Sequence, residues 1–130
     1  MTPEGLVVLA CPRPPREAMD RLAASVVRHG MTVFARIDHA AGAKDIGMAL
    51  PPTEILIFGN PKGGTPLMQA AQTLGIDLPL KALVWQDEAG KIWIGYNDPK
   101  WLARRHGVEG HDQQLDAMTS ALAAMAKDAC

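Results

Sequence analysis

The chain has 130 residues, of which 48% are hydrophobic, and this suits one globular domain with an ordinary core. Thirteen basic and fourteen acidic residues give a formal net charge of -1, so no surplus of positive charge is available for a nucleic-acid backbone. No apolar run approaches the roughly 18 residues that a membrane span requires. We therefore expect a soluble, cytoplasmic protein with neither a nucleic-acid nor a membrane partner.

The two cysteines, Cys11 and Cys130, lie near opposite ends of the chain. Two thiols in a chain of this size do not make a disulfide framework, and no Cys or His stands two to four residues from either one, as a metal motif requires. We interpret Cys11 as a small buried residue and Cys130 as a free terminal thiol. A single bridge between them is the alternative.

The first half of the chain alternates between apolar runs and helical patterns. We expect a strand at 6–10, a helix from about 15 to 28, a strand at 32–37, a short helix at 39–45 and a strand at 54–58. Asp38 is placed to cap the short helix, and Gly30 follows the basic end of the first helix, as the helix dipole favours. Glycine and proline punctuate each boundary.

The second half follows the same logic. Thr65 is expected to cap a helix with Pro66 at its first position, and Gly75 to end it. Strands at 81–86 and 92–97 are joined by a predicted hairpin turn. Asp98 begins another helix that closes on the basic residues 104–106, and a last helix is expected at about 112–127.

Strands that alternate with helices, together with one hairpin, predict an α/β or α+β fold. We expect a mixed sheet of about five strands with helices packed on it, in a single compact domain over residues 1–130. Trp85 and Trp93 flank the hairpin and are assigned to the core, with a dimer contact as the alternative.

Residues 58–66 read F-G-N-P-K-G-G-T-P and raise the question of a phosphate site. The phosphate-loop pattern needs Gly-Lys-Ser/Thr in that order, and here Lys62 precedes both glycines, so the pattern fails. Gly63 and Gly64 could still let the backbone approach an anion at the start of the following helix. The alternative is a plain strand-to-helix turn capped by Thr65.

His39 is the second candidate, because it occupies the first turn of the short helix. The positive end of the helix dipole disfavours the imidazolium there, and a neutral imidazole can act as a base or a ligand. The alternative is an ordinary helix-start residue. The sequence contains no metal-binding motif, and we predict neither a metal nor a cofactor.

Asn60 and Asn97 each end a predicted strand. In open sheets, ligands gather at the carboxyl ends of strands, where His39 and Lys62 are also expected. We therefore predict that these four side chains converge on one concavity. Local hydrogen bonds within turns are the alternative for both asparagines.

Three segments resemble a known family. They are I-D-H-A-A-G-A from residue 37, the F-G-N-P-K-G-G-T-P loop, and Y-N-D-P from residue 96. Their order is similar to that of domain-of-unknown-function family 302 (DUF302) over about residues 15–108, with an extra C-terminal helix at about 112–127. The resemblance implies a compact α/β domain that commonly packs as a homodimer. It implies no activity.

The leading functional prediction is the binding of a small polar or anionic ligand beside the loop. The residues expected to hold it are Asn60, Lys62, Gly63, Gly64, Thr65 and Asn97. One alternative is an enzyme with His39 as general base and Lys62 as anion clamp. A second is a structural or partner-binding homodimer module, and a third is a metal or haem at His39.

Overall fold

Five strands form one antiparallel sheet in the computed structural model, which describes residues 2–130. The strands are β1 (Leu6–Ala10), β2 (Thr32–Asp38), β3 (Thr53–Gly59), β4 (Leu80–Gln86) and β5 (Ile92–Asn97), in the order β1-β5-β4-β3-β2. Every neighbouring pair is antiparallel. The expected five-stranded sheet with helices in a single domain is confirmed. Its pairing is corrected from mixed to antiparallel, which makes the fold α+β.

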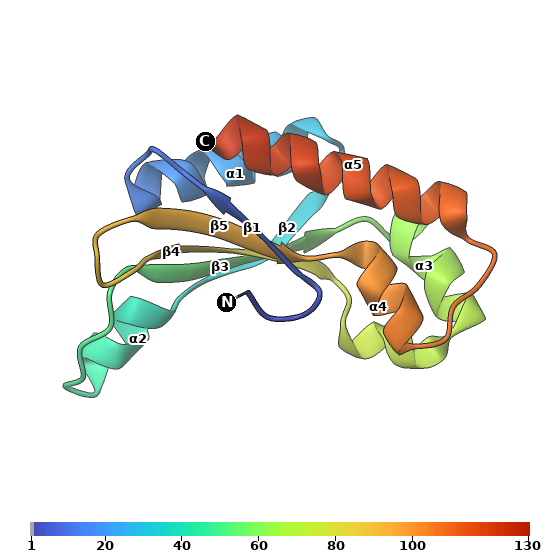
Figure 1. The fold of residues 1–130 in the computed structure, drawn as a ribbon, viewed down its shortest axis with the longest axis horizontal. Helices are drawn as coiled ribbons and strands as arrows, with labels where there is room; N and C mark the ends of the chain where they lie inside the picture. Colours follow the sequence, from blue (N-terminus) through green and yellow to red (C-terminus); the bar gives the residue numbers. More distant parts are fainter. Residues whose placement is uncertain (1) are drawn as a thin grey trace.

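The placement of the helices explains the antiparallel pairing. They are α1 (Pro15–Arg28), α2 (His39–Asp45), α3 (Pro61–Ala70), the 3-10 helix η1 (Gln72–Ile76), α4 (Pro99–Arg105) and α5 (Asp112–Ala129). Helices α1 and α5 lie side by side across one face of the sheet, whereas α2 extends past one end and α3 and α4 past the other (Figure 1). Because α2 and α3 do not cross a sheet face, the chain returns beside the strand it has just left.

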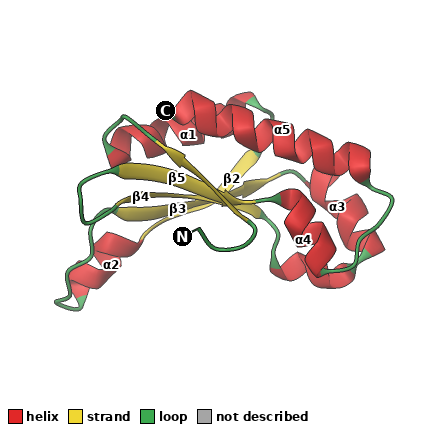
Figure 2. Ribbon diagram, in the orientation of Figure 1, coloured by secondary structure: helices red, strands yellow, loops and turns green. Residues whose placement is uncertain are grey.

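The main core lies between the sheet and the helices α1 and α5 (Figure 2). Alternate residues of β3, β4 and β5 point toward these helices, as the strand period of two requires. The largest buried members are Met19, Leu22, Val26, Leu56, Phe58, Val84, Ile94, Leu122 and Met125. The C-terminal helix, expected as an addition to the domain, therefore supplies part of its central core.

A second apolar cluster closes the end of the sheet where α3 and α4 lie. It consists of Leu67, Leu74, Leu102, Ala103 and Leu115, contributed by α3, η1, α4 and α5. This cluster fixes the short helices against the first half of α5. The carboxyl ends of β3 and β5 lie at this same end of the sheet, one on each side of β4.

The other face of the sheet is also apolar, although α1 and α5 both lie on the first face. Cross-strand pairing places Val8, Gly95, Leu83, Ile55 and Ile37 in one row across all five strands. Ile37 is 43% exposed. We call this row, with the neighbouring aromatic pair Trp85 and Trp93, the open sheet face. The two tryptophans are partly buried on it and do not belong to either core cluster, so their assignment to the core is corrected.

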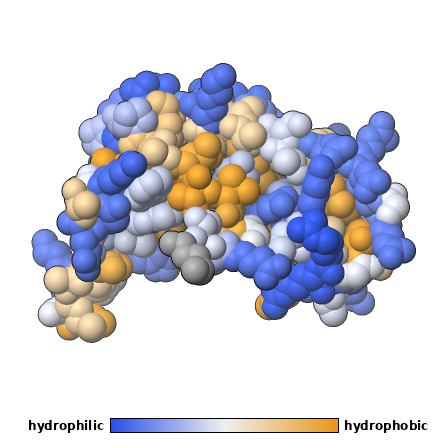
Figure 3. Space-filling model, in the orientation of Figure 1, coloured by the Kyte–Doolittle hydropathy of each residue, from blue (hydrophilic) through white to orange (hydrophobic). Residues whose placement is uncertain are grey.

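Exposed apolar side chains also mark two regions outside this face. Residues of α2 and the loop after it project from the body, and Ile46 and Met48 there are 73% and 64% exposed. Figure 3 shows apolar residues at the tip of this arm and in the middle of the viewed surface, where β1 crosses β5. Leu9 of the edge strand β1 is 41% exposed.

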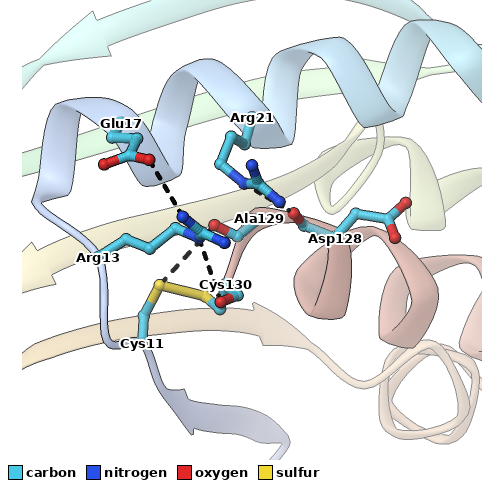
Figure 4. Close-up of a disulfide and its surroundings, with 7 residues drawn as sticks. All are labelled: Cys11, Arg13, Glu17, Arg21, Asp128, Ala129 and Cys130. Atoms are coloured by element: carbon cyan, nitrogen blue, oxygen red, sulfur yellow. Dashed lines mark hydrogen bonds and ion pairs between the residues drawn. A yellow bond between two sulfur atoms is a disulfide. The ribbon is translucent and has the colours of Figure 1, made fainter.

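A disulfide joins Cys11, just after β1, to Cys130 at the C-terminus, with the two Cα atoms 5.0 Å apart (Figure 4). The interpretation of Cys130 as a free thiol is therefore corrected. The antiparallel course of α5 along α1 brings residues together that are 119 positions apart in sequence. Separation along the chain gave no sign of this pairing.

Side chains from α1 and from the segment before it hold the last turn of α5 beside this disulfide. Arg13 Nε donates to the carbonyl of Cys130 at 3.2 Å, and Arg21 Nε donates to that of Asp128 at 3.1 Å. The buried hydroxyl of Ser25 donates to Asp128 Oδ2 at 2.7 Å. That hydrogen bond and the charge of Arg28 lower the pKa of Asp128. Carbonyls that a helix end leaves without partners are thus satisfied.

Candidate functional site

Helix α3 begins at Pro61 with Asn60 as its cap, earlier than the sequence predicts. Asn60 Oδ1 accepts a hydrogen bond from the N–H of Lys62 at 2.9 Å, and its Nδ2 donates to the carbonyl of Gly30 at 3.2 Å. Pro61 occupies the first helical position, and Pro66 lies inside the helix. The prediction of Thr65 as the cap is corrected. Asn-Pro and Thr-Pro both carry the cap-and-proline pattern, and the strand β3 ends at the first of them.

The free N–H groups in the first turn of α3 donate hydrogen bonds to Asn60. Besides Lys62, the N–H groups of Gly63 and Gly64 donate to the carbonyl of Asn60 at 3.0 and 3.2 Å. Neither glycine has a positive φ. A Cβ on Gly64 would lie 3.4 Å from Leu78 Cδ1, so the glycines allow close packing. These contacts favour the plain strand-to-helix turn over a backbone anion cradle.

A pocket of about 330 Å³ nevertheless opens beside this turn. Its lining comes from β2, β3, α3, the start of β4 with the segment before it, and α5. It consists of Phe34, Gly59, Asn60, Pro61, Gly64, Thr65, Met68, Leu78, Pro79, Leu80 and Met118. Most of these side chains are apolar. The polar groups among them stand on α3, where Thr65 is exposed. Pockets of this volume and character are typical of small-molecule sites.

The predicted site residues divide between the two ends of the sheet. Asn60 and Asn97 end β3 and β5, which run in the same direction, so both lie at one end. His39 follows β2, which is antiparallel to β3, and it therefore lies at the other end with α2 (Figure 1). The expected convergence of His39 with Lys62 is corrected. The rule about carboxyl ends applies only to strands that point the same way.

His39 sits exposed in α2, where Asp38 caps the helix as predicted. Asp38 Oδ1 accepts from the N–H of Ala41 at 2.9 Å, so the carboxylate is engaged by the backbone. None of the α2 residues is buried. Within residues 2–130, no group of three or more His, Cys, Asp or Glu side chains is placed to hold a metal ion.

A polar cluster that the sequence did not reveal joins η1 to the end of α4. His106 Nε2 lies 2.5 Å from Asp77 Oδ2, and His106 Nδ1 lies 2.9 Å from Thr73 Oγ1. Arg105 Nη1 donates to both oxygens of Asp77, at 2.9 and 2.8 Å. From the sequence alone, residues 104–106 indicate only the basic last turn of a helix. Thr73 and Asp77 carry no motif that points to them.

Burial and charge act in opposite directions on Asp77. Burial by itself raises the pKa of this carboxyl, but the hydrogen bond from His106 and the charge of Arg105 together lower it. The side chains of Asp77 and His106 are only 16% and 8% exposed. Asp77 is therefore held as a carboxylate in a well-defined position.

The family assignment follows from a sequence comparison. The model of the family described as "Domain of unknown function DUF302" matches residues 7–125. The chain belongs to the DUF302 family. The match includes most of α5, the helix expected to lie outside the family-like region.

Curated relatives of this DUF302 chain carry the name of a channel. It is 47% identical over 124 residues to "Fluoride-specific ion channel FluC 1" of Brucella suis biovar 1 (strain 1330), which is 95% of this chain and 49% of that protein. The protein of the same name from Brucella abortus biovar 1 (strain 9-941) is also 47% identical, with 46% of its length covered. The chain thus spans about half the length of these relatives.

A solved structure shares the fold of this DUF302 chain. The crystal structure of an uncharacterized conserved DUF302 protein from Bacillus stearothermophilus superimposes with a TM-score of 0.87 at 20% identity. The superposition covers 98% of this chain and 100% of the Bacillus stearothermophilus chain. Among residues 2–130, no helix combines the length and the apolar character needed to cross a membrane.

Proposed function

We propose that this DUF302 chain binds a small amphipathic molecule in the pocket beside α3. The observation that carries the proposal is the apolar lining of the pocket, about 330 Å³ in volume, next to the loop that the sequence singles out. Such a volume accommodates a small organic molecule, and its walls favour an apolar body. The leading prediction of a polar or anionic ligand thereby becomes the more specific proposal of a molecule with one polar or anionic group and one apolar body.

The polar part of the ligand belongs at the α3 rim of the pocket. Thr65 lines the pocket and is exposed, and Lys62 is exposed in the first turn of the same helix. A carboxylate placed there would be close to a cation and to the positive end of α3. Asn60 contributes shape instead of recognition, because both ends of its amide already have backbone partners.

A thermal-shift series tests the ligand proposal. We expect straight-chain carboxylates of four to ten carbons to raise the unfolding temperature increasingly with length, because each buried CH₂ contributes about 0.8 kcal/mol. Inorganic phosphate, which has no apolar part, is expected to give no shift. Sodium fluoride belongs in the panel because of the names of the Brucella relatives, and no shift is expected from it either.

Two variants on one helix show where the ligand binds. Thr65→Trp places a large ring at the pocket rim and is expected to reduce the shift, whereas Gln69→Trp, exposed on the same helix but not in the lining, keeps it. Equal shifts in both variants would contradict binding in this pocket. Stabilisation by fluoride or phosphate alone would replace the proposal with a plain anion site.

The enzyme alternative lacks a geometry to support it. His39 and Lys62 follow strands that finish at opposite ends of the sheet, so they cannot act on one small ligand.

The predicted cytoplasmic location stays a proposal. The disulfide counts against it, because cytosolic thiols are kept reduced.

A second candidate function is homodimerisation through the open sheet face. An antiparallel sheet with one solvated face normally alternates apolar and polar residues, yet here the outward row contains Val8, Leu83, Ile55 and Ile37. Val8, Ile55 and Leu83 are half-buried and Ile37 is exposed, so the row presents partly accessible apolar surface to solvent. Apolar surface that is contiguous across a sheet is typical of protein interfaces. A second copy of the chain presents the same row and can cover it by two-fold symmetry.

Light scattering with a charged variant tests the dimer. Ile55→Lys places an ammonium in the middle of the open sheet face and is expected to weaken the dimer by about 100-fold or more, because an unpaired charge would be buried. Ala24→Lys, exposed on α1, is the matched control and should leave the dimer intact. A wild-type chain that is monomeric at micromolar concentration would end this proposal.

A further inference from the structure

We propose that Thr73 is a nucleophile that accepts an acyl group from a small activated ester or thioester, with His106 as its base. The proposal is independent of the pocket beside α3. It stands on three hydrogen-bonded side chains in line: the hydroxyl of Thr73, the imidazole of His106 and the carboxylate of Asp77. A nucleophile, a base within hydrogen-bond reach and a third group that orients the base form the recurrent arrangement of covalent catalysis.

The donors and acceptors of the cluster set the direction of proton transfer. A carboxylate only accepts hydrogen bonds, so the His106 nitrogen beside Asp77, Nε2, carries the proton. In the neutral imidazole, Nδ1 is then an acceptor, and the hydroxyl of Thr73 must donate to it at 2.9 Å. The threonine proton therefore already points to the atom that would remove it.

The base is held firmly and the nucleophile is accessible. Arg105 donates twice to Asp77, and Asp77 in turn holds the ring of His106, whose side chain is 8% exposed. Thr73 is exposed at the surface of η1. A small acyl donor can therefore approach the hydroxyl from solvent. The base that removes the hydroxyl proton is already in position.

A second cluster in the molecule shows what a purely structural version looks like. Ser25, His29 and Asp128 carry the same three kinds of group, a hydroxyl, an imidazole and a carboxylate. Ser25, however, is fully buried, and its hydroxyl donates directly to the carboxylate of Asp128 at 2.7 Å. His29 Nδ1 lies 2.8 Å from the carbonyl oxygen of Ser25 and farther, 3.4 Å, from its hydroxyl. No acyl donor reaches that hydroxyl, and no imidazole stands between it and the acid.

The reaction is an ordinary acyl transfer. Thr73 Oγ1 forms a bond to the carbonyl carbon while His106 Nδ1 takes the hydroxyl proton. When the tetrahedral intermediate collapses, the bond to the leaving oxygen or sulfur breaks, and His106 returns the proton to the leaving group. The product is an ester on Thr73, which water cleaves when His106 removes its proton in the same way.

Labelling with p-nitrophenyl acetate tests the assignment. Incubation followed by peptide mass spectrometry is expected to place one acetyl group on Thr73. His106→Gln is expected to slow that labelling by about 10²-fold or more. Thr73→Ser should keep the label at residue 73, Thr73→Ala should lose it, and Ser120→Ala, an exposed hydroxyl on α5, should change nothing.

The same experiment separates activation from support of the fold. Asp77→Asn is expected to slow labelling and Asp77→Glu to restore part of it, with thermal unfolding of each variant as the check on folding. Acetyl groups found only on lysines, or equal labelling of Thr73 in wild type and His106→Gln, would overturn the proposal. If His106→Gln does not fold, the rate of labelling of Asp77→Asn against wild type decides the outcome, and equal rates would overturn the proposal.

Discussion

Replacing both cysteines with serine is expected to lower the free energy of unfolding by about 2–5 kcal/mol, and with it the unfolding temperature by about 10–20 °C. The disulfide between Cys11 and Cys130 closes a loop of almost the whole chain, with a sequence separation of 119. Joining the ends of a long loop removes much conformational entropy from the unfolded chain. Without the bridge the unfolded state regains this entropy, and the folded state is less stable relative to it. Urea unfolding of wild type and the double serine variant measures the difference.

Reductant provides the matched control for this measurement. Wild type in excess dithiothreitol should unfold like the double serine variant, and the variant itself should not respond to reductant. The native protein should also show no reactive thiol until it is unfolded and reduced. Two free thiols in the native protein, or equal midpoints for all four samples, would contradict the disulfide.

Reduction is expected to leave the end of α5 packed on α1 and the domain folded, although less stable. The last turn of that helix keeps its contacts with α1 and with the segment before it. Arg13 and Arg21 donate to backbone carbonyls, and Ser25 donates to Asp128. Met125 and Ala126 remain buried against the sheet. The bridge thus adds to an interface that is already formed by packing.

Gly5→Ala is expected to lower the free energy of unfolding by about 3 kcal/mol. Gly5 has a φ of +80°, which an alanine adopts only with strain. Its Cβ would also lie 2.6 Å from Trp101 Cγ, an atom close to the backbone of α4 that cannot swing away. The same glycine accepts a hydrogen bond from the N–H of Asp98 at 2.7 Å, so a shift here would disturb the cap of α4.

A second glycine, Gly30, separates the effect of the steric clash with Trp101 from the effect of backbone strain at positive φ. Gly30 has a nearly equal φ of +76°, but a Cβ there would meet nothing within 4 Å. Gly30→Ala is therefore expected to cost about 1–2 kcal/mol, from backbone strain alone. Chemical denaturation of both variants gives the comparison. Equal losses would show that Trp101 moves aside, and that the close approach of β1 and α4 is not tightly packed.

Most of the local structure could be read from the sequence, because it depends on neighbouring residues. Apolar runs bounded by glycine and proline placed all five strands within a residue or so. Asp38 and Asp98 cap their helices as predicted, with carboxylate oxygens on the N–H groups of Ala41 and Lys100. The start of α3 was misplaced because two cap-and-proline pairs compete within a few residues, and local preference does not rank them.

The candidate site was only partly predictable. The loop at 58–66 does border a pocket, and Asn60, Gly64 and Thr65 line it, but the walls come from residues such as Phe34, Leu78 and Met118 that no motif marks. His39 was grouped with this loop because strand directions were unknown. Antiparallel pairing of β2 with β3 separates them by the length of the sheet.

The amino-acid sequence by itself determined the helices, the strands and the membership of the DUF302 family, since each of these rests on residues close together along the chain or on their order. Tertiary structure alone decided the antiparallel pairing, the bridge between Cys11 and Cys130, the open sheet face and the cluster of Thr73, His106 and Asp77. These features join residues from distant segments. Their contacts depend on how whole elements pack, which no local pattern specifies.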